Sequence, residues 1–151
     1  MITSLGVAGA YVTDYDEAKA FFIDKLGFEL RHDLTMDGGY RWLTVGPPAS
    51  PRFQLVLTVP GPPQHDEETA AMLRALMAKG ALSAGAWHTD DCRKTFEEYS
   101  ARGVEFLQEP AERPYGVEAV FRDPFGNWYS LNEVNEAALD RQAMEEAFPR
   151  R

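Results

Sequence analysis

The chain has 151 residues, of which 44% are hydrophobic and 12% aromatic, and its formal net charge at pH 7 is −9. This composition is typical of a globular protein with a real core and excludes an intrinsically disordered chain, which carries fewer aromatic residues. The acidic balance argues against a nucleic-acid partner and against anionic membrane surfaces, because binding to either needs clustered Lys and Arg.

The first part of the chain reads as a strand, a helix and three more strands. Residues 5–12 predict the first strand, and Asp14 stands at capping-box spacing before Glu17, which predicts a helix that stops at Gly27. Further strands are expected at 28–31, 40–45 and 53–59, separated by turn segments rich in Gly and Pro.

The pattern returns after a helix expected over 66–79. A short strand at 84–89 precedes a helix that either Asp90 or Asp91 caps and that Gly103 ends. Cys92 falls on the inner face of this helix as an apolar filler, and a single cysteine excludes an internal disulfide framework. The remaining strands are expected at 104–107, 117–122 and 128–134, and the tail from 136 to 148 has helical composition.

The two parts therefore repeat each other, with Asp14 and Asp91 77 residues apart and Gly27 and Gly103 76 residues apart. A repeat of this size predicts an α+β fold of two tandem βαβββ modules, whose curved mixed sheet surrounds a cavity. The expected division is a first module over 1–61, a connector with a helix over 62–82, a second module over 83–134 and a helical tail over 135–151.

Several segments carry a family resemblance. Residues 12–22 and 25–30 in the first module, and 101–106, 113–116 and the turn Asp123-Pro124-Phe125-Gly126-Asn127 in the second, resemble the vicinal oxygen chelate superfamily. That superfamily holds glyoxalase I, extradiol dioxygenases, fosfomycin-resistance enzymes and bleomycin resistance proteins. The resemblance covers roughly residues 3–134. It implies the glyoxalase/bleomycin-resistance fold, and it implies a homodimer.

In metal-holding members of the family, four strand positions facing the cavity supply His, Gln or Glu ligands. The resemblance maps these positions onto Val7, Gln54, Ala84 and Ser130, of which only Gln54 is a conventional ligand. A divalent ion needs several N, O or S donors. A shift of one residue brings no better donors, since the neighbours are Gly6, Ala8, Ser83 and Gly85. We therefore expect no metal site and no cofactor.

Strand alternation suggests what lines the cavity instead. Side chains two apart share a face, so Tyr11 accompanies Val7, His88 accompanies Ala84, and Trp128 accompanies Ser130. Either Arg41 or Trp42 faces inward, and Tyr115 is expected on a loop at the cavity mouth, whereas His32 and His65 are expected in solvent. The candidate ligand-binding residues are Tyr11, Trp42, Gln54, His88, Tyr115, Trp128 and Ser130. No catalytic residue is assigned.

The expected function is metal-independent binding or sequestration of a hydrophobic or aromatic small molecule. The alternative is a metal-dependent lyase, isomerase or dioxygenase with a non-standard site, which requires His88, Gln54 and either Glu118 or Glu133 to converge. A third interpretation is an interaction module whose cavity is filled by its own side chains.

The chain has no secretory signal pattern and no apolar run near the ~20 residues of a membrane span, so a cytoplasmic location is expected. The sequence leaves open which ligand binds and whether any reaction is catalysed.

Overall fold

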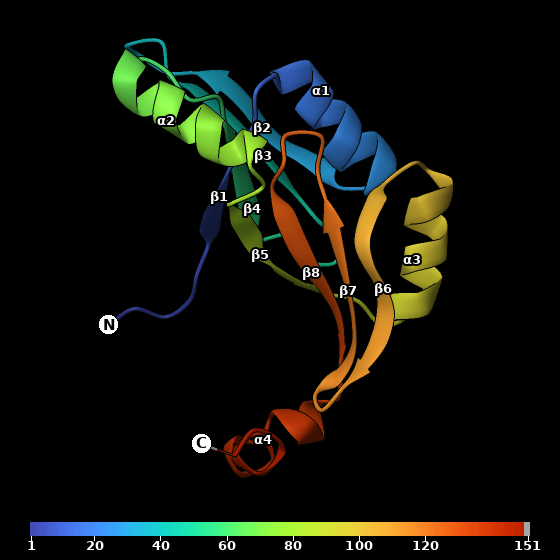
Figure 1. The fold of residues 1–151 in the computed structure, drawn as a ribbon. Helices are drawn as coiled ribbons and strands as arrows, with labels where there is room; N and C mark the ends of the chain where they lie inside the picture. The colour runs from blue at the N-terminus through green and yellow to red at the C-terminus, as the bar shows by residue number, and fades with distance from the viewer. Residues whose placement is uncertain (150–151) are drawn as a thin grey trace. The chain divides into compact units, whose positions relative to one another are not determined.

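The computed structural model describes residues 1–149, which form two compact units. The first unit contains residues 1–84 together with 123–127, and the second contains residues 85–122 together with the chain from 128 onward. Eight strands form two four-stranded mixed sheets, ordered β1-β4-β3-β2 and β5-β8-β7-β6 (Figure 1). The two matching sheets confirm the α+β architecture predicted from the repeat. The four-part division of the chain stays a prediction.

The first sheet is built on a parallel pair of strands. β1 (Val7–Tyr11) runs beside β4 (Gln54–Thr58). The antiparallel strands β3 (Arg41–Gly46) and β2 (Glu29–Thr35) complete the sheet, with a register shift within β2. The centre of one face of this sheet is apolar and buried, with Leu43, Val45, Leu55 and Leu57 all at 0% exposure.

The helix against this buried face begins where the capping box predicts. The carboxylate of Asp14 accepts a hydrogen bond from the backbone N–H of Glu17 at 2.8 Å, which caps α1 (Tyr15–Lys19). The chain continues as a π-helical segment, η1 (Ala20–Lys25), and leaves it at Gly27, whose φ of 74° suits glycine. Phe21 and Phe22 of η1 are buried, so this irregular stretch still presents an apolar side to the core.

The turn at 123–127 belongs to the first unit and is fixed by side-chain hydrogen bonds. Asp123 accepts from the backbone N–H groups of Phe125 and Asn127. The side-chain amide of Asn127 donates to the backbone carbonyl of Tyr11 at 2.7 Å, which ties the turn to the end of β1. Within the same unit, Asp66 caps α2 (Glu67–Ala78), in agreement with the predicted connector helix.

The second unit repeats the first in order. β5 (Ser83–His88) leads to α3 (Cys92–Ala101), and Asp91, not Asp90, caps this helix. β6 (Glu105–Arg113), β7 (Gly116–Arg122) and β8 (Trp128–Val134) form the rest of the sheet. The short helices η2 (Glu136–Leu139) and α4 (Arg141–Ala147) follow. Within residues 1–149, no helix has the length and apolar character needed to span a membrane.

Candidate functional site

The face of the first sheet opposite its buried leucines carries the polar and aromatic candidates. In a parallel pair, side chains in register point the same way, so Tyr11 beside Thr58 and Val7 beside Gln54 share this face. Alternation along β3 places Trp42 with them. Arg41 lies on the other side, where its guanidinium stands 4.5 Å from the centre of the Tyr15 ring. We call this the pocket face, and it carries Val7, Gly9, Tyr11, Trp42, Thr44, Gln54, Val56 and Thr58.

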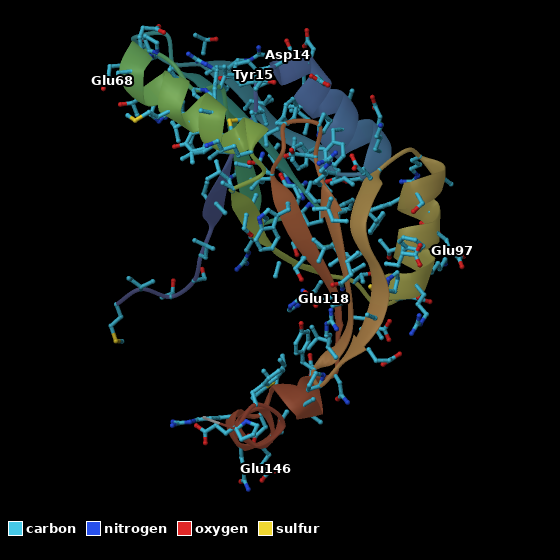
Figure 2. The ribbon with its side chains drawn as sticks, viewed as in Figure 1. Asp14, Tyr15, Glu68, Glu97, Glu118 and Glu146 are labelled. Atoms are coloured by element: carbon cyan, nitrogen blue, oxygen red, sulfur yellow. The ribbon has the colours of Figure 1, made fainter. Side chains whose placement is uncertain are left out.

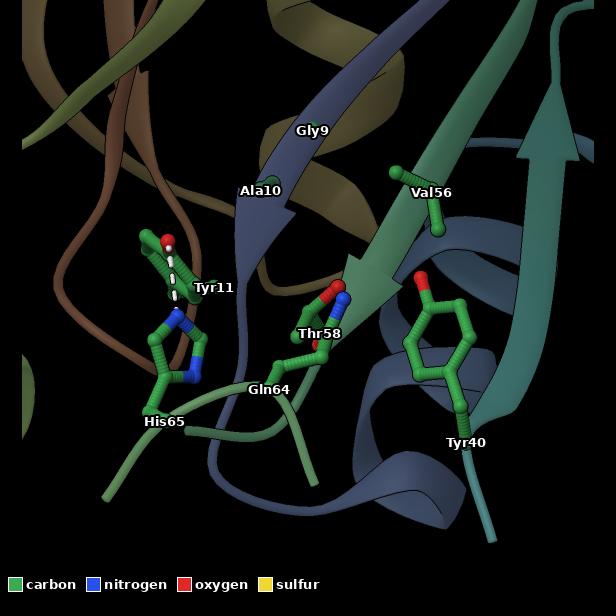
Figure 3. Close-up of a pocket in the computed structure, with 8 residues that line it drawn as sticks. All are labelled: Gly9, Ala10, Tyr11, Tyr40, Val56, Thr58, Gln64 and His65. Carbon is green, nitrogen blue, oxygen red and sulfur yellow. Dashed lines mark hydrogen bonds between the residues drawn. The ribbon is translucent and has the colours of Figure 1, made fainter. Parts of the chain in front are cut away.

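A cavity of about 270 Å³ lies on the pocket face (Figure 3). Eight residues line it: Gly9, Ala10, Tyr11, Tyr40, Val56, Thr58, Gln64 and His65. This volume falls just below the usual range of small-molecule sites, about 300–1,000 Å³. A second hollow of about 590 Å³, near the N-terminal segment and residues 50–53, contains none of the predicted site residues. The smaller cavity is therefore the candidate ligand site.

Tyr11 and His65 meet at one end of this cavity. The Tyr11 hydroxyl lies 3.4 Å from Nε2 of His65, and the two rings contact each other edge to face at 5.6 Å between centroids (Figure 3). The expectation that His65 lies in solvent is wrong: the residue is half-buried, and its Nδ1 is buried with no hydrogen-bond partner among the described residues. The cause is local, because the backbone N–H of His65 bonds to the carbonyl of Gly61 and folds this loop toward the sheet.

Gln54 is held by a small polar cluster further along the pocket face. Its Oε1 accepts a hydrogen bond from the hydroxyl of Thr44 at 2.8 Å and lies 3.0 Å from Nδ1 of His32. Thr44 is completely buried. His32 is exposed overall, as expected, but its Nδ1 is engaged in this cluster. The amide oxygen of Gln54 is thus already used by two neighbours.

The four positions that the family uses for a metal ion do not fit one in this chain. Val7 is the register neighbour of Gln54 and offers no donor atom, and neither does Ala84. The hydroxyl of Ser130 is bonded to Glu118 and Asn132. Within residues 1–149, no group of three or more His, Cys, Asp or Glu side chains is placed to hold a metal ion. One neutral amide oxygen and one hydroxyl do not make the donor set that a divalent ion requires.

The second unit places Tyr115 and Ser130 around one carboxylate, Glu118 of β7. Glu118 is labelled in Figure 2. Glu118 accepts hydrogen bonds from Arg113 at 2.9 Å, Tyr115 at 3.0 Å and Ser130 at 2.9 Å. Burial alone raises the pKa of Glu118, but the hydrogen bonds from Arg113, Ser130 and Tyr115 outweigh it, and the net pKa is lowered. This carboxylate is therefore a charged, saturated acceptor that orients Tyr115 and Ser130.

The remaining candidates lie in more open positions. His88 is exposed and makes no side-chain hydrogen bond among residues 1–149, and Trp128 is 36% exposed at the start of β8. Glu133 accepts from the backbone N–H of Cys92 at the start of α3. Within the described part of the second unit, neither Glu118 nor Glu133 is hydrogen-bonded to His88. Cys92 is buried, and burial raises the pKa of its thiol, which makes it a poor nucleophile.

Six of the residues that line the cavity were not predicted from the sequence: Ala10, Tyr40, Val56, Thr58, Gln64 and His65. Thr58 could have been predicted, because it lies on the same strand as Gln54 and side chains at every second position share a face. Gln64 and His65 stand in a loop, and no sequence periodicity reports where a loop folds.

Comparisons with known proteins agree with this architecture. The family model described as Glyoxalase/Bleomycin resistance protein/Dioxygenase superfamily matches residues 4–131. The crystal structure of UcmS2 is 50% identical with a TM-score of 0.83, covering 88% of this chain and 99% of that one. The structure of TnmS3, an antibiotic binding protein from Streptomyces sp. CB03234, is 29% identical with a TM-score of 0.70, covering 89% and 98%. An uncharacterized protein of Shewanella frigidimarina is 34% identical over 127 residues, which are 83% of this chain and 89% of its own.

Proposed function

The chain belongs to the Glyoxalase/Bleomycin resistance protein/Dioxygenase superfamily, and we propose that it binds and sequesters a hydrophobic or aromatic small molecule without a metal ion. The observation that carries this proposal is the cavity of about 270 Å³ on the pocket face. Its walls are aromatic at two places, Tyr11 and Tyr40, and apolar at Gly9 and Val56. Such a lining favours a flat, apolar ligand, because aromatic side chains bury large areas and stack on rings.

Unpaired polar groups in the same cavity support a binding role over a purely structural one. The hydroxyls of Tyr40 and Thr58 and the amide of Gln64 line the cavity, and within residues 1–149 none of these groups has a hydrogen-bond partner. A few polar groups that converge on an apolar cavity are typical of small-molecule sites. The third interpretation, a cavity filled by its own side chains, is less well supported, because this cavity remains open.

Two further findings support independence from metal. The oxygen of Gln54 is held by Thr44 and His32, and the other three family positions supply at most the hydroxyl of Ser130. In addition, TnmS3, to which this chain is 29% identical, is described as an antibiotic binding protein. Sequestration of a ligand needs shape and desolvation, and it needs no reactive group.

Isothermal titration of the wild-type protein with neutral aromatic compounds (naphthalene, 2-ethylnaphthalene, 2-acetonaphthone and flavone) tests this proposal. We pair it with Gly9→Leu, since a side chain at Gly9 grows into the cavity beside Val56 and position 9 has no backbone strain. Gly6→Leu is the matched control, because a Cβ there meets nothing within 4 Å and Gly6 does not line the cavity.

We expect saturable binding of at least one compound, a loss of at least about tenfold in affinity in Gly9→Leu, and unchanged affinity in Gly6→Leu. No saturable binding by any of the four compounds, or equal affinity in Gly9→Leu and wild type, overturns the proposal.

A further inference from the structure

We infer that this cavity selects neutral ring compounds that carry a hydrogen-bond acceptor oxygen, and that the selecting donor is Nδ1–H of His65, whose tautomer Tyr11 sets. This inference rests on the proposed function and adds the chemical class of the ligand.

The neutrality of the ligand follows from the lining. None of the eight cavity residues is Asp, Glu, Lys or Arg, although 26% of the chain is charged. A charged ligand would lose its hydration on entering this site without gaining an opposite charge, and this desolvation is unfavourable in free energy. The cavity therefore disfavours carboxylates and amines relative to neutral compounds of the same shape.

The donor follows from the hydrogen bond between Tyr11 and His65. A neutral imidazole carries one proton, so one ring nitrogen donates and the other accepts. Within the described residues, the hydroxyl of Tyr11 has one hydrogen-bond partner, Nε2 of His65, 3.4 Å away. When the phenol donates to Nε2, the imidazole proton resides on Nδ1.

Nδ1 of His65 is then a buried donor that lacks an acceptor within residues 1–149. Buried polar groups are nearly always paired, and an unpaired one is costly, so a ligand oxygen that accepts from it gains more than the same contact in water. In Figure 3 this nitrogen points toward the side of the cavity where Gln64 lies. Because His65 and Gln64 both line the cavity, this is the side from which a ligand would approach Nδ1.

The test compares three probes that share one ring system. 2-Acetonaphthone is neutral and carries a carbonyl acceptor, 2-ethylnaphthalene has the same shape without the acceptor, and 2-naphthoate carries a negative charge. Each is titrated into the wild-type protein and into His65→Phe, which keeps an aromatic ring and removes the donor. We expect 2-acetonaphthone to bind wild type at least tenfold more tightly than either other probe. We expect that preference, taken as the ratio of the two affinities, to vanish in His65→Phe.

Equal affinity for 2-acetonaphthone and 2-ethylnaphthalene in wild type, a preference that survives in His65→Phe, or tightest binding of 2-naphthoate overturns the inference and leaves the proposed function standing. Failure of all three probes to bind overturns the inference, and the proposed function falls with it only if naphthalene and flavone also fail to bind. A second measurement does not depend on the folding of a variant: nitrogen NMR of wild-type His65 should show the proton on Nδ1, and the Nδ1 resonance should shift with 2-acetonaphthone but not with 2-ethylnaphthalene. A proton on Nε2 contradicts the inference.

Discussion

A partly buried hydrogen bond joins Gln54 and Thr44 on the pocket face. Thr44 is completely buried, and its hydroxyl has Gln54 Oε1 as its acceptor at 2.8 Å. Gln54 could be singled out from the sequence because it stood alone among four otherwise unsuitable positions. The hydrogen-bond partners of Gln54 could not be predicted from the sequence. His32 lies 22 residues away in the chain and reaches Gln54 only when β2, β3 and β4 pair.

Gln54→Leu should destabilise the protein by about 1–3 kcal/mol, because it removes the acceptor 2.8 Å from the buried hydroxyl of Thr44 and leaves it only the 3.3 Å contact with Nδ1 of His32. Thr44→Val removes that hydroxyl, so the double variant should lose less than the sum of the two single variants. Urea unfolding measures all three. Strict additivity would show that the hydrogen bond contributes nothing specific.

Glu118 makes the stability of the folded state depend on pH, and the direction of this dependence follows from its lowered pKa. Burial opposes ionisation, but Arg113, Ser130 and Tyr115 hold the pKa below its ordinary value of 4.5. A carboxyl whose pKa is lowered on folding stabilises the folded state fully above its ordinary pKa, and this contribution is lost as the pH falls through the lowered value.

Glu118→Gln should therefore lower the free energy of unfolding at neutral pH and flatten its decline below about pH 4.5. Glu97→Gln is the control, because Glu97 is exposed on α3 and has no ion pair among the described residues. Urea titrations between about pH 3 and pH 7 measure the effect. A Glu118→Gln profile parallel to that of wild type contradicts the assignment.

At the scale of elements, the sequence placed helices and most strands, and its errors have physical causes. β8 was predicted over 128–134 and is Trp128–Val134. β6 was predicted to end at Leu107 and continues to Arg113, because an edge strand with a register shift tolerates Pro110. The π-helical geometry of η1 was not predicted, since Ala18, Phe21, Phe22 and Leu26 recur at the spacing of an α-helix.

The turn at 123–127 was correctly predicted from its residues, and its packing explains why glycine is needed. Gly126 has φ of 94°, and a Cβ there would lie 2.1 Å from the carbonyl oxygen of Met77. Gly38 has a similar φ of 87° and open space around it.

Gly126→Ala should thus cost about 3 kcal/mol or more, from both strain and clash, whereas Gly38→Ala should cost about 1–2 kcal/mol from strain alone. Thermal unfolding of both variants separates the two effects. Equal losses of stability would show that Gly126 is retained only for its φ.

For the whole molecule, the repeat predicted two similar units, and the structure contains them. The lining of the cavity could be predicted only in part. Tyr11 was a candidate from the sequence, but the loop at 64–65 was not, because loop placement depends on contacts that no local pattern encodes. The homodimer and the cytoplasmic location remain predictions. The sequence alone shows that the four family positions carry too few donors for a divalent ion. The two polar side chains among them, Gln54 and Ser130, are also hydrogen-bonded to neighbouring residues.

Ligand binding without metal is the central claim, and calorimetric titration with 2-acetonaphthone tests it most directly. The protein is compared as purified, after treatment with EDTA, and after addition of Zn²⁺ or Mn²⁺ to the treated sample. The account predicts the same affinity and enthalpy in all samples, since no described residues form a metal site. Loss of binding with EDTA that either ion restores would contradict it.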